Sequence, residues 1–205
     1  MSLPDVTSRE QWLDARRRLL AQEKEFTRRR DALNADRRRL PMVRVDQEYV
    51  FDGPDGTVTL AGLFGDSRQL IVQHVMLGPD WDQPCPGCSA SIDELSLGVL
   101  DHLRTRETAF VLTSRAPQAK IAAVAKERNW SVPWYSSYGS DFNYDYQVTL
   151  DAARGQDQYN YRAEPELMGG AYWLLDLTAL GRQEDWEEPK GRVTAVRGGD
   201  PTFTS

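Results

Sequence analysis

The stretch QLIVQHVMLGPDWDQPCPGC, residues 69–88, decides how this chain is expected to fold. Residues 70–77 form a nearly unbroken apolar run, which is typical of a central strand buried on both faces. A loop rich in Gly, Pro and Asp follows, and then Cys85 and Cys88 in a Cys-x-x-Cys spacing. The apolar spacing of residues 88–104 predicts a helix. The cysteines are therefore expected where a buried strand passes into a helix.

Further along the chain, residues 108–114 predict a second buried strand and residues 117–129 a second helix. Pro117 suits the first turn of that helix. The order strand, helix, strand, helix predicts the α/β class with a parallel pair of strands. The other predicted elements are short, and they are a hairpin turning at residues 53–56, strands at 132–137 and 146–150, and a helix at 167–177.

Residues 8–39 predict one long helix. Ser8 and Gln11 match a capping box, and no Pro or Gly interrupts before Pro41. An apolar residue recurs every seventh position, at Trp12, Leu19, Phe26 and Leu33. Such a narrow stripe cannot bury the helix by itself, so we expect it to pack on the rest of the chain or on a second copy, as in a homodimer.

The composition excludes several classes of protein. The chain has 205 residues, of which 40% are hydrophobic, so it suffices for one packed domain with some chain left over. We expect a helical arm at 1–40, an α/β domain at 41–182, and a flexible tail at 183–205. No apolar run approaches the roughly 18–20 residues of a membrane span. The N-terminus lacks a signal-peptide pattern, so a cytoplasmic protein is expected.

The net charge of −6 is unevenly distributed along the chain. Residues 1–40 hold eleven Lys and Arg against seven Asp and Glu, whereas the remainder holds fourteen against twenty-four. A basic arm is a feature of some nucleic-acid-binding proteins. Because this arm interleaves both signs of charge, we do not expect it to bind nucleic acid.

The cysteine pair favours redox chemistry. A sulfur at the start of a helix faces unpaired amide N–H groups and a partial positive charge, which stabilise a thiolate and lower the thiol pKa. Cys85 would attack a disulfide, and Cys88, one turn further on, would resolve the mixed disulfide. Asp80 and Asp82 would oppose this, because nearby carboxylates raise a thiol pKa.

Different uses of the two cysteines remain open. A zinc site would need His74 and His102 as its further ligands, although His74 in a buried strand is more typical of a satisfied core histidine. A structural disulfide in a small loop, or a pair of unreactive buried thiols, would also account for the two cysteines. A peroxidase is disfavoured because the Thr/Ser-x-x-Cys pattern is absent, and Asp82 stands three residues before Cys85.

Several segments resemble a bacterial thioredoxin-like family. They are residues 44–54, GPDW at 78–81 leading into CPGCS at 85–89, and SSYGSDFNYD at 136–145. The family is catalogued as domain of unknown function 899 and is described as predicted dithiol-disulfide oxidoreductases. The resemblance runs from about residue 8 to 182. It implies a thioredoxin-like fold with Cys85 and Cys88 at the cysteine positions of the family.

The chain departs from the family near its C-terminus. Members of the family usually carry an apolar β-hairpin before the final helix, but residues 151–166 here run almost directly into residues 168–172. The predicted fold is therefore a thioredoxin-like βαβ core with a long N-terminal helix and a shortened C-terminal β-hairpin region. A strand edge left open by the shortening would need cover from residues 8–39, residues 131–150 or a second subunit.

The sequence thus predicts a thioredoxin-like thiol-disulfide oxidoreductase, with Cys85 attacking and Cys88 resolving. Trp81, Pro86 and Trp134 are predicted to contact the substrate, a protein or small-molecule disulfide. Neither a cofactor nor a metal is required by this chemistry. The rival hypothesis is a catalytically idle thioredoxin-fold module for interaction or dimerisation.

Overall fold

The computed structural model describes residues 5–156 of the chain. The chain divides into two compact units, Met1–Asp46 and Gln47–Ser205. The helix predicted at 167–177, the tail, and residues 157–166 of the shortened hairpin region lie outside the described residues. The three-part division of the chain stays a prediction.

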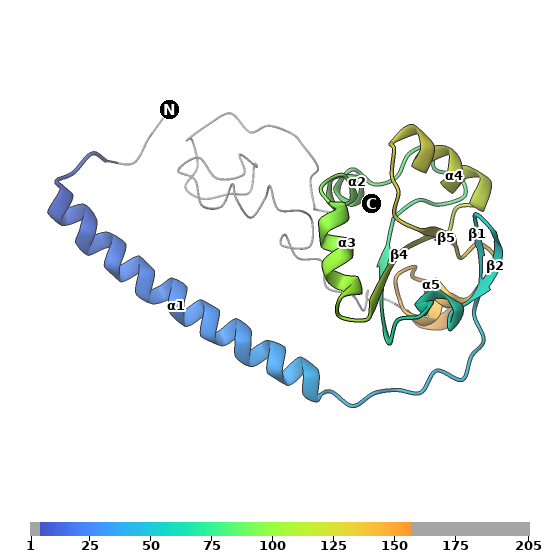
Figure 1. Cartoon of the computed structure of the whole chain (residues 1–205), viewed down its shortest axis with the longest axis horizontal. Helices are drawn as coiled ribbons and strands as arrows, with labels where there is room; N and C mark the ends of the chain where they lie inside the picture. Colours follow the sequence, from blue (N-terminus) through green and yellow to red (C-terminus); the bar gives the residue numbers. More distant parts are fainter. Residues whose placement is uncertain (1–4, 157–205) are drawn as a thin grey trace. The chain divides into compact units, whose positions relative to one another are not determined.

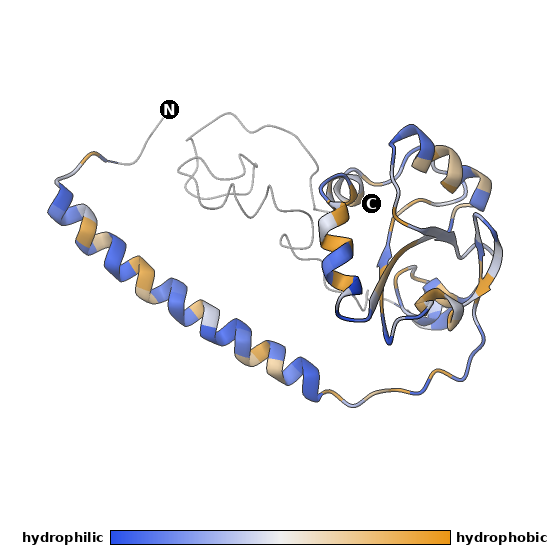
Figure 2. Cartoon of the chain, viewed as in Figure 1, coloured by the Kyte–Doolittle hydropathy of each residue, from blue (hydrophilic) through white to orange (hydrophobic). Residues whose placement is uncertain are grey.

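The first unit contains the long helix α1 (Arg9–Arg39), as predicted. The Ser8 hydroxyl accepts the backbone N–H of Gln11, and the Gln11 side chain accepts the N–H of Ser8, which completes the capping box. Arginines pair with carboxylates three or four residues away, as Arg28 and Arg29 do with Glu25. No residue of α1 is buried, and Figure 2 shows isolated apolar residues on a hydrophilic helix. Capping and local ion pairs therefore support α1, and the packing partner of its apolar stripe stays a prediction.

The second unit is built on a five-stranded mixed sheet in the order β2-β1-β5-β4-β3 (Figure 1). The strands β3, β4 and β5 are parallel, whereas β1 is antiparallel to both β2 and β5. The strand bounds are Val50–Gly53 for β1, Gly56–Thr59 for β2, Gln69–His74 for β3, Thr108–Ser114 for β4 and Trp134–Ser136 for β5.

Helices join the parallel strands. Between β3 and β4 lie α2 (Pro86–Asp93) and α3 (Leu97–Arg104), and between β4 and β5 lies α4 (Gln118–Glu127). Three further helices are short, and they are η1 (Gly62–Phe64), α5 (Phe142–Asp145) and η2 (Ala152–Arg154). The cysteine-bearing strand, its helix and a parallel neighbour form the predicted βαβ core. The predicted α/β, thioredoxin-like class is therefore confirmed.

The sheet separates two apolar clusters. Along β4, Leu112 faces a cluster that includes Ile92 of α2 and Ile121 of α4, whereas Val111 faces one that includes Phe51 and Phe142. Successive residues of a strand point to opposite faces of the sheet. The helices α2, α3 and α4 thus cover one face, and η1 and α5 cover the other.

Three expectations about single elements were wrong. The helix predicted at 88–104 is two helices, because the Ser96 side chain accepts the N–H of Val99 and begins α3. The strand β3 is at the edge of the described sheet, with Ile71 41% exposed, and β4 is the strand buried on both faces. Residues 146–150 form no strand, because the Asn143 carbonyl accepts the N–H groups of both Val148 and Thr149 and turns the backbone.

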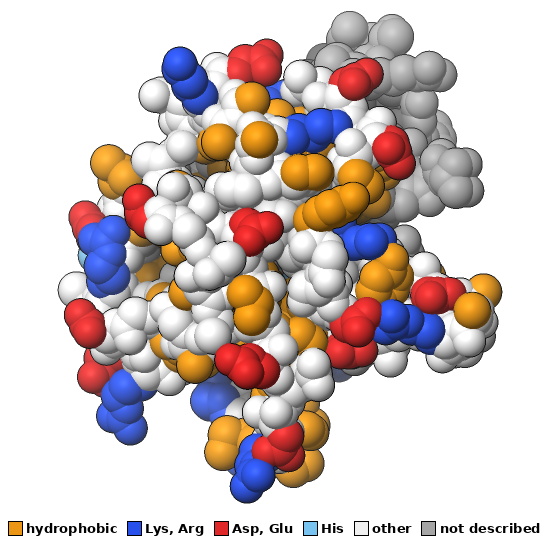
Figure 3. All heavy atoms as spheres, turned by 90° about the vertical axis from the view of Figure 1, so that its right-hand side faces the viewer, with side chains coloured by type: hydrophobic (Ala, Val, Ile, Leu, Met, Phe, Trp, Pro, Cys, Tyr) orange, Lys and Arg blue, Asp and Glu red, His pale blue; other side chains and the backbone are white. Residues whose placement is uncertain are grey.

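Among residues 5–156, no helix is both long and apolar enough to cross a bilayer. On the face shown in Figure 3, acidic and basic side chains are interspersed, with apolar side chains between them.

A buried serine joins the ends of the three parallel strands. The Ser114 hydroxyl donates to the carbonyl of Val75, just after β3, at 2.6 Å. It accepts the indole N–H of Trp134, in β5, at 2.9 Å. Ser114 is fully enclosed, so no water can replace either partner.

We predict that Ser114→Ala lowers the free energy of unfolding by about 2–4 kcal/mol, because two buried polar groups lose their partner. Urea denaturation measures this change. The matched control is Ser131→Ala, which removes an exposed hydroxyl and should change stability by less than about 0.5 kcal/mol. Equal stability of the two variants would contradict the assignment of Ser114 as the joint between the strands.

Candidate active site

Cys85 lies where the chain passes from β3 into α2. The helix begins at Pro86, and Cys85 is the residue that caps it, with extended backbone angles of φ −51° and ψ 132°. Proline suits the first helical position because it has no N–H to leave unpaired. The Cys85 amide donates to the Met76 carbonyl at 2.9 Å, which fixes the cysteine against the loop that leaves β3.

Three donors converge on the Cys85 sulfur. They are the Cys88 thiol and the backbone N–H groups of Cys88 and Gly87. The Cys88 thiol is the strongest influence, and together the donors overcome the opposing effect of burial and lower the pKa of Cys85 from 9.0 to about 5. The pKa of Cys88 is raised, because its thiol hydrogen is held by Cys85 and because it is more buried. At neutral pH the pair is therefore a Cys85 thiolate beside a Cys88 thiol.

Both cysteines are free and partly accessible. The Met76 N–H also hydrogen-bonds the Cys88 sulfur, so Met76 contacts both cysteines through its backbone. Asp80 and Asp82, which we expected to raise the pKa of Cys85, are not among the groups that shift it. Their carboxylates belong to exposed residues, where solvent screens their charge.

The loop before the cysteines is held by α4. Lys120 donates through Nζ to the carbonyls of Pro79, at 2.6 Å, and Trp81, at 2.9 Å. Gly78 lies close against the Trp81 ring. A Cβ at this position would stand only 3.1 Å from the indole Cδ1, which is tighter than an ordinary contact. Sequence reasoning assigned no role to Lys120, since nothing in its own helix marks it as a loop anchor.

The predicted substrate contacts fall in two places. Trp81 is 44% exposed, and Pro86 is exposed in the first turn of α2, next to Cys85. Trp134 is only 3% exposed and bonds to Ser114 within the core. This burial gives Trp134 a structural role and does not support direct contact with a substrate.

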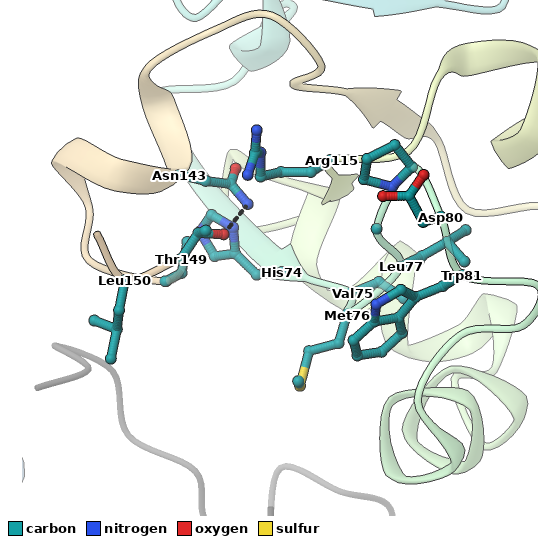
Figure 4. A pocket seen from close by; sticks show the side chains of 13 residues that line it. His74, Val75, Met76, Leu77, Asp80, Trp81, Arg115, Asn143, Thr149 and Leu150 are labelled. Atoms are coloured by element: carbon teal, nitrogen blue, oxygen red, sulfur yellow. Dashed lines mark hydrogen bonds between the residues drawn. The ribbon is translucent and has the colours of Figure 1, made fainter. Parts of the chain in front are cut away.

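The same loop also lines a pocket of about 420 Å³ (Figure 4). It is formed by residues 74–81, by Arg115 after β4, and by Asn143 with residues 148–150. Sequence reasoning missed Arg115 and Asn143 as site residues. A usable signal was that Arg115 follows β4, since the carboxyl ends of parallel strands meet at one edge of a sheet and bind ligands there.

His74 lines this pocket, and its ring already has a hydrogen-bond partner and a stacking partner. Its Nδ1 lies 3.1 Å from the Thr113 hydroxyl, and its ring stacks on Phe142. Burial lowers the pKa of His74 to about 4, so the ring is neutral at pH 7. His102 is exposed on α3, and residues 5–156 hold no group of three or more His, Cys, Asp or Glu side chains that could bind a metal.

Comparisons with known proteins place the chain in a family. Among solved structures, a solution structure titled "putative protein disulfide isomerase" from Bacteroides thetaiotaomicron is similar, with 20% identity and a TM-score of 0.35. The similarity covers 49% of this chain and 62% of that chain, so the assignment of the fold rests on the strand order described above. Among curated proteins, none matches the chain. The sequence model of a family described as bacterial proteins of unknown function, DUF899, matches residues 1–166, and the chain therefore belongs to the DUF899 family, as the resemblance implied.

Proposed function

We propose that the protein is a thiol-disulfide oxidoreductase that acts through Cys85 and Cys88. The observation that carries the proposal is the convergence of three hydrogen-bond donors on the Cys85 sulfur at the start of α2. A cysteine that only packs in a core is not surrounded by donors in this way, and its pKa is raised by burial. Here the donors outweigh burial, and Cys85 also remains partly accessible.

In the first step the Cys85 thiolate attacks one sulfur of a substrate disulfide. A bond forms between Cys85 and that sulfur, and the other substrate sulfur leaves as a thiolate. In the second step Cys88, as a thiolate, attacks the Cys85 sulfur, and the second substrate thiolate leaves. The substrate disulfide is thereby reduced by two electrons, and the protein dithiol is oxidised to a disulfide.

The hydrogen bond between the cysteines controls the order of these two steps. Cys88 retains its proton while Cys85 is a thiolate, because the thiolate is the acceptor that raises the pKa of Cys88. Once Cys85 is part of a mixed disulfide, its negative charge is gone and it holds the Cys88 proton less strongly. Cys88 then ionises more readily and becomes the better nucleophile at the moment when it is needed.

The proposal extends to the surroundings of the site. Trp81 and Pro86 lie at the surface beside Cys85 and would line the approach of a protein or small-molecule disulfide. No bound cofactor is needed, since a partner dithiol in the cytoplasm would return the electrons. If the cysteines prove inert, the hypothesis of an idle interaction or dimerisation module remains.

We predict that the protein accelerates the reduction of insulin disulfides by dithiothreitol, and that Cys85→Ser returns the rate to that of dithiothreitol alone. Cys88→Ser should instead accumulate a mixed disulfide on Cys85 when the protein meets a small disulfide, and intact-mass spectrometry detects the adduct. Ser131→Ala, far from the chemistry in sequence and exposed, should match the wild type. Unchanged insulin reduction by Cys85→Ser would refute the proposed function.

The pH dependence of alkylation tests the cause of the lowered pKa. We predict that the rate at which iodoacetamide labels Cys85 rises through about pH 5 and levels off by neutral pH, because only the thiolate reacts. In Cys88→Ala the midpoint should rise by at least one pH unit, since the strongest stabilising donor is lost. It should stay below 9.0, because the backbone amides of Gly87 and residue 88 remain. A wild-type midpoint between pH 8 and 9 would contradict the geometry.

The lowered pKa of Cys85 also affects the reduction potential of the Cys85–Cys88 pair. A stabilised thiolate favours the reduced dithiol over the disulfide, and therefore makes the disulfide more oxidising. We predict a reduction potential above the value of about −270 mV that thioredoxin shows and below the value of about −120 mV of strong oxidants. Equilibration with glutathione redox buffers measures it. A potential below about −270 mV would show that ionisation of Cys85 does not set the poise.

A further inference from the structure

The pocket beside the cysteine loop has a polar end and an apolar end. Figure 4 shows Arg115, Asn143 and His74 in one region of the lining and the side chains of Met76 and Trp81 together in another. Because His74 is neutral at pH 7, Arg115 is the only cationic side chain among the described residues that line the pocket. A ligand that fits both ends would carry an anionic group on an aliphatic body.

Within the described residues, the Arg115 guanidinium has no counter-ion. Its Nε is enclosed and has no hydrogen-bond acceptor within the described part of the chain. Its one ring contact is with Tyr144, whose centroid lies 4.6 Å from Cζ, and no ion pair joins it to a carboxylate of residues 5–156. A buried donor without an acceptor is unfavourable, and a carboxylate that bound the guanidinium fork would supply one.

The apolar end of the pocket connects to the cysteines through Met76. Its side chain lines the pocket, while its backbone carbonyl accepts the Cys85 N–H and its N–H bonds the Cys88 sulfur. Trp81 also lines the pocket and belongs to the loop that leads directly into Cys85. A molecule anchored at Arg115 and extended over Met76 would therefore lie against the residue whose backbone bonds both cysteines.

We propose that this pocket binds the carboxylate of a small aliphatic disulfide, with Arg115 as the anion-binding residue and Met76 and Trp81 as the apolar wall. The proposal rests on the thiol-disulfide exchange proposed above and names its substrate class. Asp80 also lines the pocket and opposes an anion, but it belongs to the exposed loop and forms no ion pair with Arg115. Its carboxylate weakens the preference for anions without removing it.

Exchange in this pocket follows the same electron balance. The Cys85 thiolate bonds to one sulfur of the anchored disulfide, and the distal half leaves as a thiolate. Cys88 then displaces the anchored half, which leaves as a second thiolate, while Cys85 and Cys88 become a disulfide. Two electrons pass from the protein dithiol to the substrate, and the carboxylate only binds.

Three disulfides of similar size and different charge test the proposal. The reduced protein is mixed with 3,3′-dithiodipropionate, which is anionic, with bis(2-hydroxyethyl) disulfide, which is neutral, or with cystamine, which is cationic. The second-order rate of Cys85 oxidation is expected to be about tenfold higher for the anionic than for the neutral disulfide, and lowest for cystamine. Asp80→Asn should increase the preference for the anionic disulfide.

Substitution of Arg115 gives the decisive comparison. Arg115→Gln should lower the rate with the anionic disulfide to that with the neutral disulfide, so that the preference is lost, and urea denaturation shows whether the variant is folded. The matched control is Arg128→Gln, because Arg128 contacts Gln83 and Asp93 near the cysteines but does not line the pocket. Equal loss of preference in both variants would assign the effect to general surface charge and overturn the proposal.

Binding can also be measured without the cysteines. In Cys85→Ser/Cys88→Ser protein, titration with propionate should shift the Arg115 Nε–H signal in ¹⁵N spectra, whereas propionamide should leave it in place. Absence of this shift would overturn the pocket even if all three disulfides react. Conversely, a shift with propionate combined with inert cysteines would refute the proposed function and retain the anion site.

Discussion

The hydrogen bond between the Cys88 thiol and the Cys85 sulfur, made at the first turn of α2, is the interaction on which the site depends. It gives the two cysteines different properties although both belong to one short turn. The pKa of Cys85 is lowered, so that it is a thiolate, whereas the pKa of Cys88 is raised, so that it keeps its proton. Without this bond the start of α2 would still offer two amides to Cys85, but the strongest cause of the difference in pKa between the two cysteines would be lost.

That hydrogen bond requires a fixed backbone on both sides of the cysteines. On the β3 side, Met76 bonds both cysteines, and the preceding Val75 is tied to Ser114 of β4. On the α2 side, the Gln73 side chain of β3 donates to the Ser91 hydroxyl at 2.9 Å, which joins strand to helix directly. The turn that carries the cysteines is thus held by the same parallel strands that form the core. Loss of the hydrogen bonds of Ser114 would therefore change both the stability of the fold and the pKa of the Cys85 thiol.

The sequence predicted those features whose cause is local or periodic. The capping box of α1, the buried apolar run of β4, and the Cys-x-x-Cys turn between strand and helix are all of this kind. It did not predict features that depend on distant partners. The edge position of β3 depends on which strands pair, and the turn at Asn143 depends on its own carbonyl outcompeting a sheet partner. Arg115 and Lys120 gain their roles only when β4 and α4 reach the cysteine loop.

The loop between β3 and α2 borders both the cysteines and the pocket, so the residues that would select a substrate can differ from those that ionise Cys85. The backbone of Met76 in this loop bonds both cysteines, and the first turn of α2 supplies the donors that lower the pKa of Cys85. The side chains of Met76 and Trp81 line a pocket in which Arg115 is the only cation among the described residues. Because the neutral His74 adds no charge, the pocket distinguishes ligands by a single guanidinium fork. Substrate preference could therefore change through Arg115 or Asp80 without any change in the donors that ionise Cys85.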